Sequence, residues 1–387
     1  MNRLFLSLFL GCAAAAVMTF SGMSQAQTFT VLHAFNGDGQ SPYDRLFLAK
    51  GKLYGTTFGV GINGQLGTVF ELGVQGIGHV LYRFTGTSGA APEAGLAQDT
   101  AGNWYGTTIE GGTFGFGTVF KLDSSGNETV LYNFSGGADG YTPAAGVILD
   151  GTGNLYGTTV WGGDANCNHG QGCGTVYKVD ASGSHTVLYT FTGGNKDGGT
   201  PTNGSLIRDA AGNLLGTTGF NGAHGSGTIF KVHSDGTETI LYNFASGANP
   251  SSGLIADKQG NLYGETLWGG TNQLGTVFKI NGQDVVTVLY NFAGGSDGSG
   301  PTGGLLLDSK GNLYGTTSFG GTIGSNGYGT VFEIAKDGTE TVLHQFVQNS
   351  DGLTPYGGVV RDAQGNLYGT TAQGGAYNVG TVFKITQ

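Results

Sequence analysis

Apolar and polar positions along this chain fall into short runs, and the same order of runs returns every 49 to 58 residues. Within each unit an apolar run precedes Asp-x-x-Gly-Asn-Leu-Tyr-Gly-Thr-Thr, then Gly-Thr-Val-Phe, then Val-Leu-Tyr-x-Phe. All seven prolines of the chain stand just before the first run: Pro42, Pro92, Pro143, Pro201, Pro250, Pro301 and Pro355. Four strand-like segments in a unit of about 50 residues predict a β-propeller with seven blades.

The sixth unit illustrates the expected elements. Its strands are predicted at residues 304–307, 313–317, 329–334 and 341–346. Between the first two strands, Asp308 can bond its own backbone and Gly311 can supply a positive φ, as tight turns require. The Val, Leu, Tyr and Phe of each strand are expected to fill the core between blades, and the repeated Gly-Thr to allow close backbone approach.

The phase of the repeat predicts how the ring closes. After residue 26 the chain begins with a fourth strand, residues 29–35, and it ends with a third strand, residues 380–385. The N-terminal strand should therefore complete the blade built from residues 357–385, which removes exposed sheet edges. We expect an all-β, seven-bladed propeller of four antiparallel strands per blade, forming a single domain over residues 27–387.

Residues 1–26 have a different composition. Arg3 precedes an apolar stretch, residues 4–20, and Ser24-Gln25-Ala26 supplies the small residues of a signal peptidase site. We expect cleavage after Ala26 and export to the periplasm or the extracellular space. Lipidation at Cys12 is the alternative, and it would leave an apolar stub on the exported protein.

Charge and cysteine content limit the partners. The net charge of −10 disfavours nucleic acid, and no stretch after residue 30 is long and apolar enough to span a bilayer. We expect a monomer without a cofactor. Cys167 and Cys173 bracket a short insertion, where a disulfide suits an oxidising compartment better than a metal site without a second ligand pair.

The two rims of the predicted ring differ. The turns of Asp-x-x-Gly-Asn type are too short for a binding site, whereas the loops on the other rim, which carry the prolines, are long and varied. Aspartates followed by glycine recur there and could bind Ca²⁺, but an ordinary turn explains them as well: Asp38, Asp139, Asp197, Asp297 and Asp351.

Four aromatic residues occupy equivalent positions after the second strand: Trp161, Phe220, Trp268 and Phe319. They could stack on sugar rings at the rim. Strand alternation places them on the same side as the leucine of Leu-Tyr-Gly, so packing over the blade end is the structural alternative.

Symmetry breaks after three of the prolines, in units that neighbour one another around the ring. Tyr43, Asp44 and Arg45 stand in the first unit, Glu93 in the second and Tyr356 in the seventh. These side chains could meet at the channel mouth to hold a polar ligand or perform acid–base chemistry, with Asp44, Arg45 and Glu93 as the catalytic candidates. The alternative is closure packing with an ion pair. No nucleophile elbow, P-loop or three-histidine set is present.

The recurring Leu-Tyr-Gly-Thr-Thr, Gly-Thr-Val-Phe-Lys and Thr-Val-Leu-Tyr-x-Phe motifs resemble the GloVer (Gloeo–Verruco) tandem repeat over residues 28–387. That resemblance implies an exported bacterial protein and no established activity. Two hypotheses follow. The first is a non-catalytic module that binds a glycan or a protein on the rim whose loops carry the prolines. The second is a propeller enzyme, a lyase, lactonase or hydrolase, with its site at the channel mouth.

Overall fold

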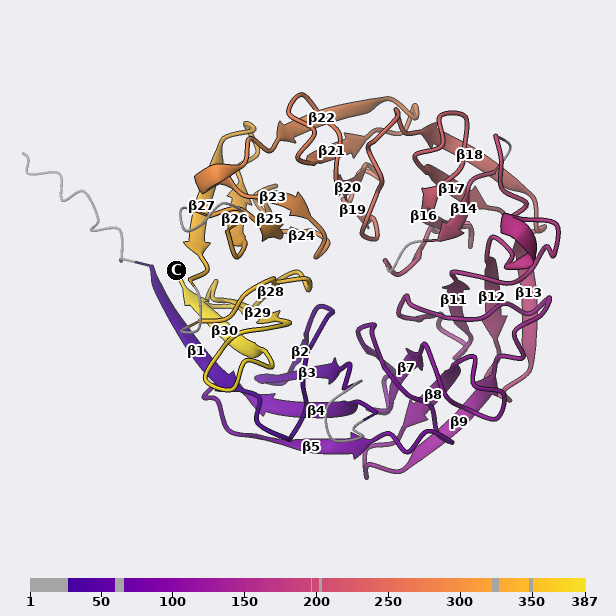
Figure 1. Ribbon diagram of the computed structural model, residues 1–387, viewed down its shortest axis with the longest axis horizontal. Helices are drawn as coiled ribbons and strands as arrows, with labels where there is room; N and C mark the ends of the chain where they lie inside the picture. The colour runs from indigo at the N-terminus through magenta and orange to yellow at the C-terminus, as the bar shows by residue number, and fades with distance from the viewer. Residues whose placement is uncertain (1–26, 60–65, 196, 202–203, 322–326, 348–350) are drawn as a thin grey trace, which may run out of the picture.

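The computed structural model describes residues 27–59, 66–195, 197–201, 204–321, 327–347 and 351–387. The described residues form seven small antiparallel sheets, which stand around a central axis as the blades of a propeller (Figure 1). The predicted all-β fold with seven blades is therefore confirmed. The predicted signal peptide, residues 1–26, lies outside the described residues.

Blades 1 to 3 follow one another along the chain, and in each the strands run from the channel to the outer edge. Blade 1 contains β2 (Phe47–Ala49), β3 (Lys52–Thr57), β4 (Thr68–Gly73) and β5 (Gly78–Arg83). Blade 2 contains β6 (Ala97–Gln98), β7 (Trp104–Thr108), β8 (Thr118–Leu122) and β9 (Glu128–Asn133). Blade 3 contains β10 (Ile148–Leu149), β11 (Leu155–Thr159), β12 (Thr175–Val179) and β13 (His185–Thr190), with a 3-10 turn at Asn168–Gly170.

Blades 4 to 6 continue in the same order. Blade 4 contains β15 (Ile207–Arg208), β16 (Leu214–Phe220), β17 (Thr228–Val232) and β18 (Glu238–Asn243), and β14 (Gly199–Pro201) pairs with the end of β16. Blade 5 contains β19 (Ile255–Ala256), β20 (Leu262–Thr266), β21 (Thr276–Ile280) and β22 (Val286–Asn291). Blade 6 contains β24 (Leu306–Leu307), β25 (Leu313–Phe319), β26 (Thr330–Ile334) and β27 (Glu340–Gln345), with β23 (Ser299–Pro301) beside β25 and a 3-10 turn at Gly295–Asp297.

Blade 7 joins the two ends of the chain, as the phase of the repeat predicts. It contains β28 (Val360–Arg361), β29 (Leu367–Thr371), β30 (Thr381–Thr386) and, at its outer edge, β1 (Thr28–Ala34). Thr28 pairs with Thr386 and Ala34 pairs with Thr381. The N-terminal strand therefore closes the ring and covers the edge that β30 would otherwise expose.

The core lies between neighbouring blades. At each junction, the aromatic residue that follows the fourth strand packs edge-to-face on an aromatic residue of the third strand of the next blade, with ring centroids 5.1 to 5.3 Å apart. Such a pair adds about 0.5–1.5 kcal/mol to the burial of its two rings. The seven pairs are Phe35–Phe70, Phe84–Phe120, Phe134–Tyr177, Phe191–Phe230, Phe244–Phe278, Phe292–Phe332 and Phe346–Phe383.

The repeated proline packs on the repeated glycine of the preceding blade. A Cβ added to Gly67, which has a φ of +98°, would lie 2.3 Å from Cδ of Pro92 and 2.5 Å from the carbonyl oxygen of Thr57. The same contact recurs at every junction, up to Gly380 against Pro42. Glycine is thus required for the close approach that the sequence predicts at Gly-Thr.

The two threonines of the second strand have separate roles. The second threonine shares a hydrogen bond of 2.8 to 2.9 Å with the first threonine of the third strand in all seven blades. In blades 1, 2, 4, 6 and 7 the first threonine donates to a carbonyl oxygen of the next blade, as Thr56 does to Ala94 at 2.9 Å and Thr217 to Ser252 at 3.0 Å. Blade 5 has Glu265 at this position.

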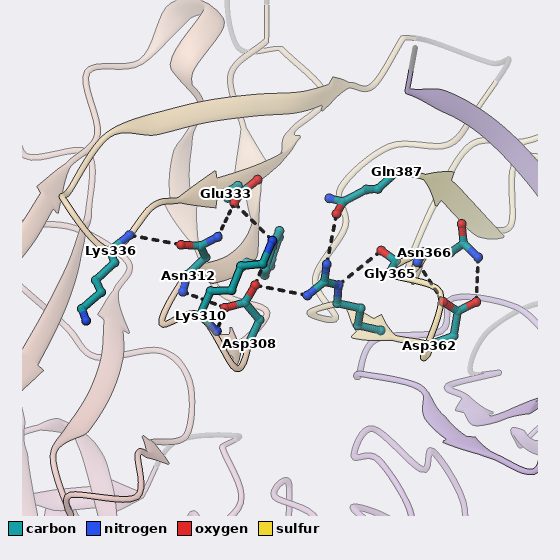
Figure 2. A network of polar contacts seen from close by, with 11 residues as sticks. Asp308, Lys310, Asn312, Glu333, Lys336, Asp362, Gly365, Asn366 and Gln387 are labelled. Atoms are coloured by element: carbon teal, nitrogen blue, oxygen red, sulfur yellow. Dashed lines mark hydrogen bonds and ion pairs between the residues drawn. The ribbon is translucent and has the colours of Figure 1, made fainter. Parts of the chain in front are cut away.

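On the rim of the Asp-x-x-Gly-Asn turns, a polar network joins blade 6 to blade 7. Arg361 donates from Nη1 to Oδ2 of Asp308 at 3.1 Å and from Nη2 to Oε1 of Gln387 at 3.5 Å (Figure 2). The side chain of Asp308 is 3% exposed, and the guanidinium also lies over the ring of Tyr314. The arginine therefore connects the first strand of blade 7 both to blade 6 and to the C-terminal residue.

Candidate functional site

A cavity of about 620 Å³ opens in the channel, lined from the loops that carry the prolines. We call this the channel cavity. Its wall includes five polar residues that break the symmetry of the repeat and two of the four equivalent aromatic residues. They are Tyr43, Asp44, Arg45, Glu93 and Tyr356, with Trp161 and Phe220. The structure thus brings seven of the nine candidate residues together.

The two tyrosines stand where the first and last blades meet. Their ring centroids are 5.3 Å apart with planes tilted by 31°, and Tyr43 also packs edge-to-face on Phe58 at 5.2 Å. Burial raises the pKa of Tyr43, and the neighbouring Tyr356 and the carboxylate of Glu93 raise it further. The phenol is therefore a hydrogen-bonding group at neutral pH, with Glu93 close by.

Asp44 is held by backbone groups. Oδ1 accepts the N–H of Arg45 at 2.6 Å, and Oδ2 accepts the N–H of Gly95 in blade 2. Burial raises the pKa of the Asp44 carboxyl, while these N–H groups and the Arg45 guanidinium act in the opposite direction. Both oxygens are thus engaged in joining blade 1 to blade 2.

Trp268 and Phe319 do not line the channel cavity. Their rings stack on each other with centroids 6.3 Å apart and planes 10° from parallel, and Trp268 remains 39% exposed. Phe220, on the cavity wall, is 56% exposed. Of the four equivalent residues, Trp161 and Phe220 therefore line the cavity, whereas Trp268 and Phe319 stack on each other outside it.

The repeated aspartates of the rim have partners within their own blades. Asp139, Asp197 and Asp297 each accept a hydrogen bond from the tyrosine of the fourth strand at 2.8 to 2.9 Å. His33 and His344 take the place of that tyrosine beside Asp38 and Asp351. These carboxylates fix the loops that begin at the fourth strand. In the part of the chain described, no three His, Cys, Asp or Glu side chains cluster as metal ligands.

One polar pair at the cavity was missed from the sequence: Ser252 lines the cavity, and Glu265 is buried behind it. Ser252, which lines the cavity, donates from Oγ to Oε2 of Glu265 at 3.2 Å, and the N–H of Gly304 donates to the same oxygen at 2.9 Å. Glu265 is 1% exposed, and its Oε1 has no hydrogen-bond partner among the described residues. Burial raises the pKa of Glu265 to about 7. The available signal was the replacement of the repeated threonine by glutamate in one unit only.

The predicted disulfide is present between Cys167 and Cys173, six residues apart. It closes the insertion before β12 and packs against the loop of Gly193, whose added Cβ would lie 2.5 Å from the sulfur of Cys167. No helix among the described residues has the length and apolar character needed to cross a bilayer.

The fold and the cavity define a seven-bladed propeller with a ligand-sized channel opening on one rim. A family model described as the Gloeobacter/Verrucomicrobia repeat matches residues 12–207 and 202–387, so the chain belongs to that repeat family. No curated protein matches the sequence.

Solved structures share the fold at low identity. A candidate 6-phosphogluconolactonase from Bacteroides uniformis is 15% identical with a TM-score of 0.54, over 83% of this chain and 89% of the other. The extracellular domain of a candidate one-component system from B. thetaiotaomicron is 16% identical with a TM-score of 0.55, over 90% and 41%. PorZ, a surface component of the type-IX secretion system of Porphyromonas gingivalis, is 14% identical with a TM-score of 0.54, over 91% and 47%. At these identities the likeness shows the fold alone.

Proposed function

We propose that this protein is an exported, non-catalytic propeller that binds a saccharide in the channel cavity. The observation that supports this most directly is that two kinds of side chain line the same cavity. Trp161 and Phe220 present aromatic surface, while Tyr43, Glu93 and Tyr356 present hydrogen-bonding groups. A sugar ring has apolar C–H faces that stack on aromatic rings and hydroxyls that bond carboxylates and phenols.

The size of the cavity favours a small ligand over a protein surface. A concave site of about 300–1,000 Å³ is the usual range for small-molecule binding, and the channel cavity of about 620 Å³ falls within it. The disulfide and the predicted signal peptide fit an oxidising compartment outside the cytoplasm, where saccharides are available.

The two tryptophans of the rim supply a matched test. Trp161 lines the cavity and Trp268 does not, although they occupy equivalent repeat positions. A panel of oligosaccharides is screened by calorimetry with the purified protein, then with Trp161→Ala and Trp268→Ala, with and without Ca²⁺. We expect a Ca²⁺-independent ligand whose affinity falls about 10-fold or more in Trp161→Ala, on the scale of one lost stacking contact. Equal affinity in all three proteins, or no ligand at all, rejects the proposal.

The second candidate function is hydrolysis of an ester or lactone, and the pair Ser252–Glu265 favours it. Glu265 could accept the proton of the Ser252 hydroxyl while Oγ attacks a carbonyl carbon, and a carboxyl with a pKa near 7 suits a general base. The lactonase description of one structural neighbour belongs to that protein, so this candidate depends on the pair. Hydrolysis of p-nitrophenyl esters or aldonolactones that Ser252→Ala abolishes would replace the binding proposal with this one.

A further inference from the structure

The channel has a ring of glycines at one level, interrupted at one position. Three residues after each proline stand Gly95, Gly146, Gly204, Gly253, Gly304 and Gly358, and in blade 1 this residue is Arg45. The ring is tight: a Cβ added to Gly204 would lie 1.7 Å from the backbone nitrogen of Gly253. Arg45 is therefore the only one of the seven equivalent residues that has a side chain.

The guanidinium of Arg45 is available to a ligand. The residue is exposed and lines the channel cavity. The guanidinium donates one hydrogen bond to a described residue, and it is a long one, from Nη1 to the carbonyl oxygen of Leu305 in blade 6 at 3.4 Å. None of the ion pairs among the described residues includes Arg45. A guanidinium carries five N–H donors in a planar fork, so most of them have no partner among the described residues.

Among the described residues, neither nearby carboxylate, Asp44 or Glu93, forms an ion pair with the guanidinium of Arg45. Asp44 is committed to the backbone N–H groups of Arg45 and Gly95. Glu93 lies beside Tyr43, whose ring packs on Tyr356, and a carboxylate there is an acceptor for sugar hydroxyls. The cavity thus offers an aromatic wall, an acceptor for hydroxyls and one planar cation.

We infer that the channel cavity selects acidic saccharides, with Arg45 binding the carboxylate of a uronic acid residue. A planar carboxylate matches the guanidinium fork through two parallel N–H···O bonds. Trp161 and Phe220 then face the sugar rings. This inference rests on the proposed function, and it names the class of ligand that the cavity takes.

The test compares ligands that differ in charge and proteins that differ at one position. Binding of trigalacturonate and of neutral maltotriose is measured by calorimetry at low salt and at 0.3 M salt. Arg45→Gly is the central variant, because glycine is the residue of the other six units and should preserve the fold. Arg45→Gln keeps the length of the side chain without its charge. Arg83→Gln removes an arginine on the outer strand β5, away from the cavity.

We expect the native protein to prefer trigalacturonate, and both Arg45 variants to lose about 10- to 100-fold in affinity for it, as for a hydrogen bond to a charged group. Affinity for maltotriose should stay within a factor of about 3, the size of a neutral contact change below 1 kcal/mol. Salt should weaken only the acidic ligand, and Arg83→Gln should behave as the native protein.

The outcomes separate this inference from the proposed function. Equal affinity for the two trisaccharides, with binding lost in Trp161→Ala, overturns the role of Arg45 and leaves a neutral-saccharide module. Binding of sulfated maltotriose with no binding of trigalacturonate would contradict the inference that Arg45 binds a carboxylate. If no trisaccharide binds, the proposed function fails and the inference fails with it.

Discussion

Asp44 of blade 1 accepts the backbone N–H of Gly95 of blade 2 through Oδ2, while its Oδ1 accepts the N–H of Arg45 at 2.6 Å. An aspartate that the sequence offered as a catalytic candidate therefore connects the inner ends of two blades. Its neighbour Arg45 is oriented by the same contact, since the carboxylate fixes the backbone from which the guanidinium extends.

Removing the Asp44 carboxylate should lower the stability of the folded protein. We expect Asp44→Ala to lower the free energy of unfolding by about 2 kcal/mol, because two backbone donors lose their acceptor. Asp44→Asn retains one acceptor oxygen and should lose about half as much. Urea denaturation followed by tryptophan fluorescence measures both. Native-like stability in Asp44→Ala would leave the carboxylate without a structural role and return it to the list of catalytic candidates.

Closure of the ring gives a second prediction. Phe35 follows β1 and packs on Phe70 across the closing junction, as Phe84 packs on Phe120 at the next junction. Phe35→Ala and Phe84→Ala should each cost about 3–5 kcal/mol, the range for a buried Phe→Ala change. Deleting residues 27–36 should cost more, because β30 then loses its partner strand as well. A truncated protein that melts within a few degrees of the native one would contradict closure by β1.

The fold was predictable because every element occurs seven times. A chance pattern of apolar and polar residues in one unit can therefore be recognised by comparison with the other six. The details that escaped depend on single residues. The first strand of the sixth unit was expected over residues 304–307, but β24 begins at Leu306. Gly304 adopts a φ of +75° and directs its N–H to Glu265, so it does not join the sheet.

The candidate site was only partly predictable, since equivalent positions in a repeat need not have equivalent surroundings. Trp161 and Trp268 share a register, yet only Trp161 lines the cavity, while Trp268 stacks on Phe319. The spacing of the repeat predicts where a residue lies on its strand. The contacts of its side chain also depend on the neighbouring loop, which differs from blade to blade. The convergence of Tyr43, Glu93 and Tyr356 was expected from their adjacent units, and all three line the same cavity.

The glycine of Gly-Thr offers a third prediction, with a control that separates two effects. Gly117 and Gly102 have φ values of +98° and +88°, but only Gly117 packs tightly. A Cβ there would lie 2.3 Å from the carbonyl oxygen of Thr108 and 2.8 Å from Cδ of Pro143, whereas Gly102 has open space.

Gly102→Ala should therefore cost only the strain of a positive φ, about 1–2 kcal/mol. Gly117→Ala should cost at least 1–3 kcal/mol more, roughly the cost of forced overpacking. The two free energies of unfolding, measured side by side in urea, test this. Equal losses would show that the junction between blades 2 and 3 yields to a methyl group.

The last prediction concerns Glu265 and pH. Burial raises the pKa of this carboxyl from 4.5 to about 7 in the folded protein, so the folded state binds its proton more tightly than the unfolded chain does. The stability that this proton contributes is fully present below pH 4.5 and is lost as pH rises through about 7. At 1.36 kcal/mol per pKa unit, the loss is on the order of 3 kcal/mol.

Glu265→Thr restores the threonine of the other six blades and removes this dependence. Its free energy of unfolding relative to the native protein should increase by that amount between pH 4 and pH 8. Other glutamates with raised pKa values, such as Glu238 and Glu340, are present in both proteins and cancel in the difference. Glu110→Gln, at an exposed glutamate, controls for the change in net charge. A difference between Glu265→Thr and the native protein that stays constant with pH would mean that the Ser252 hydroxyl and the Gly304 N–H stabilise the carboxylate as fully as water does.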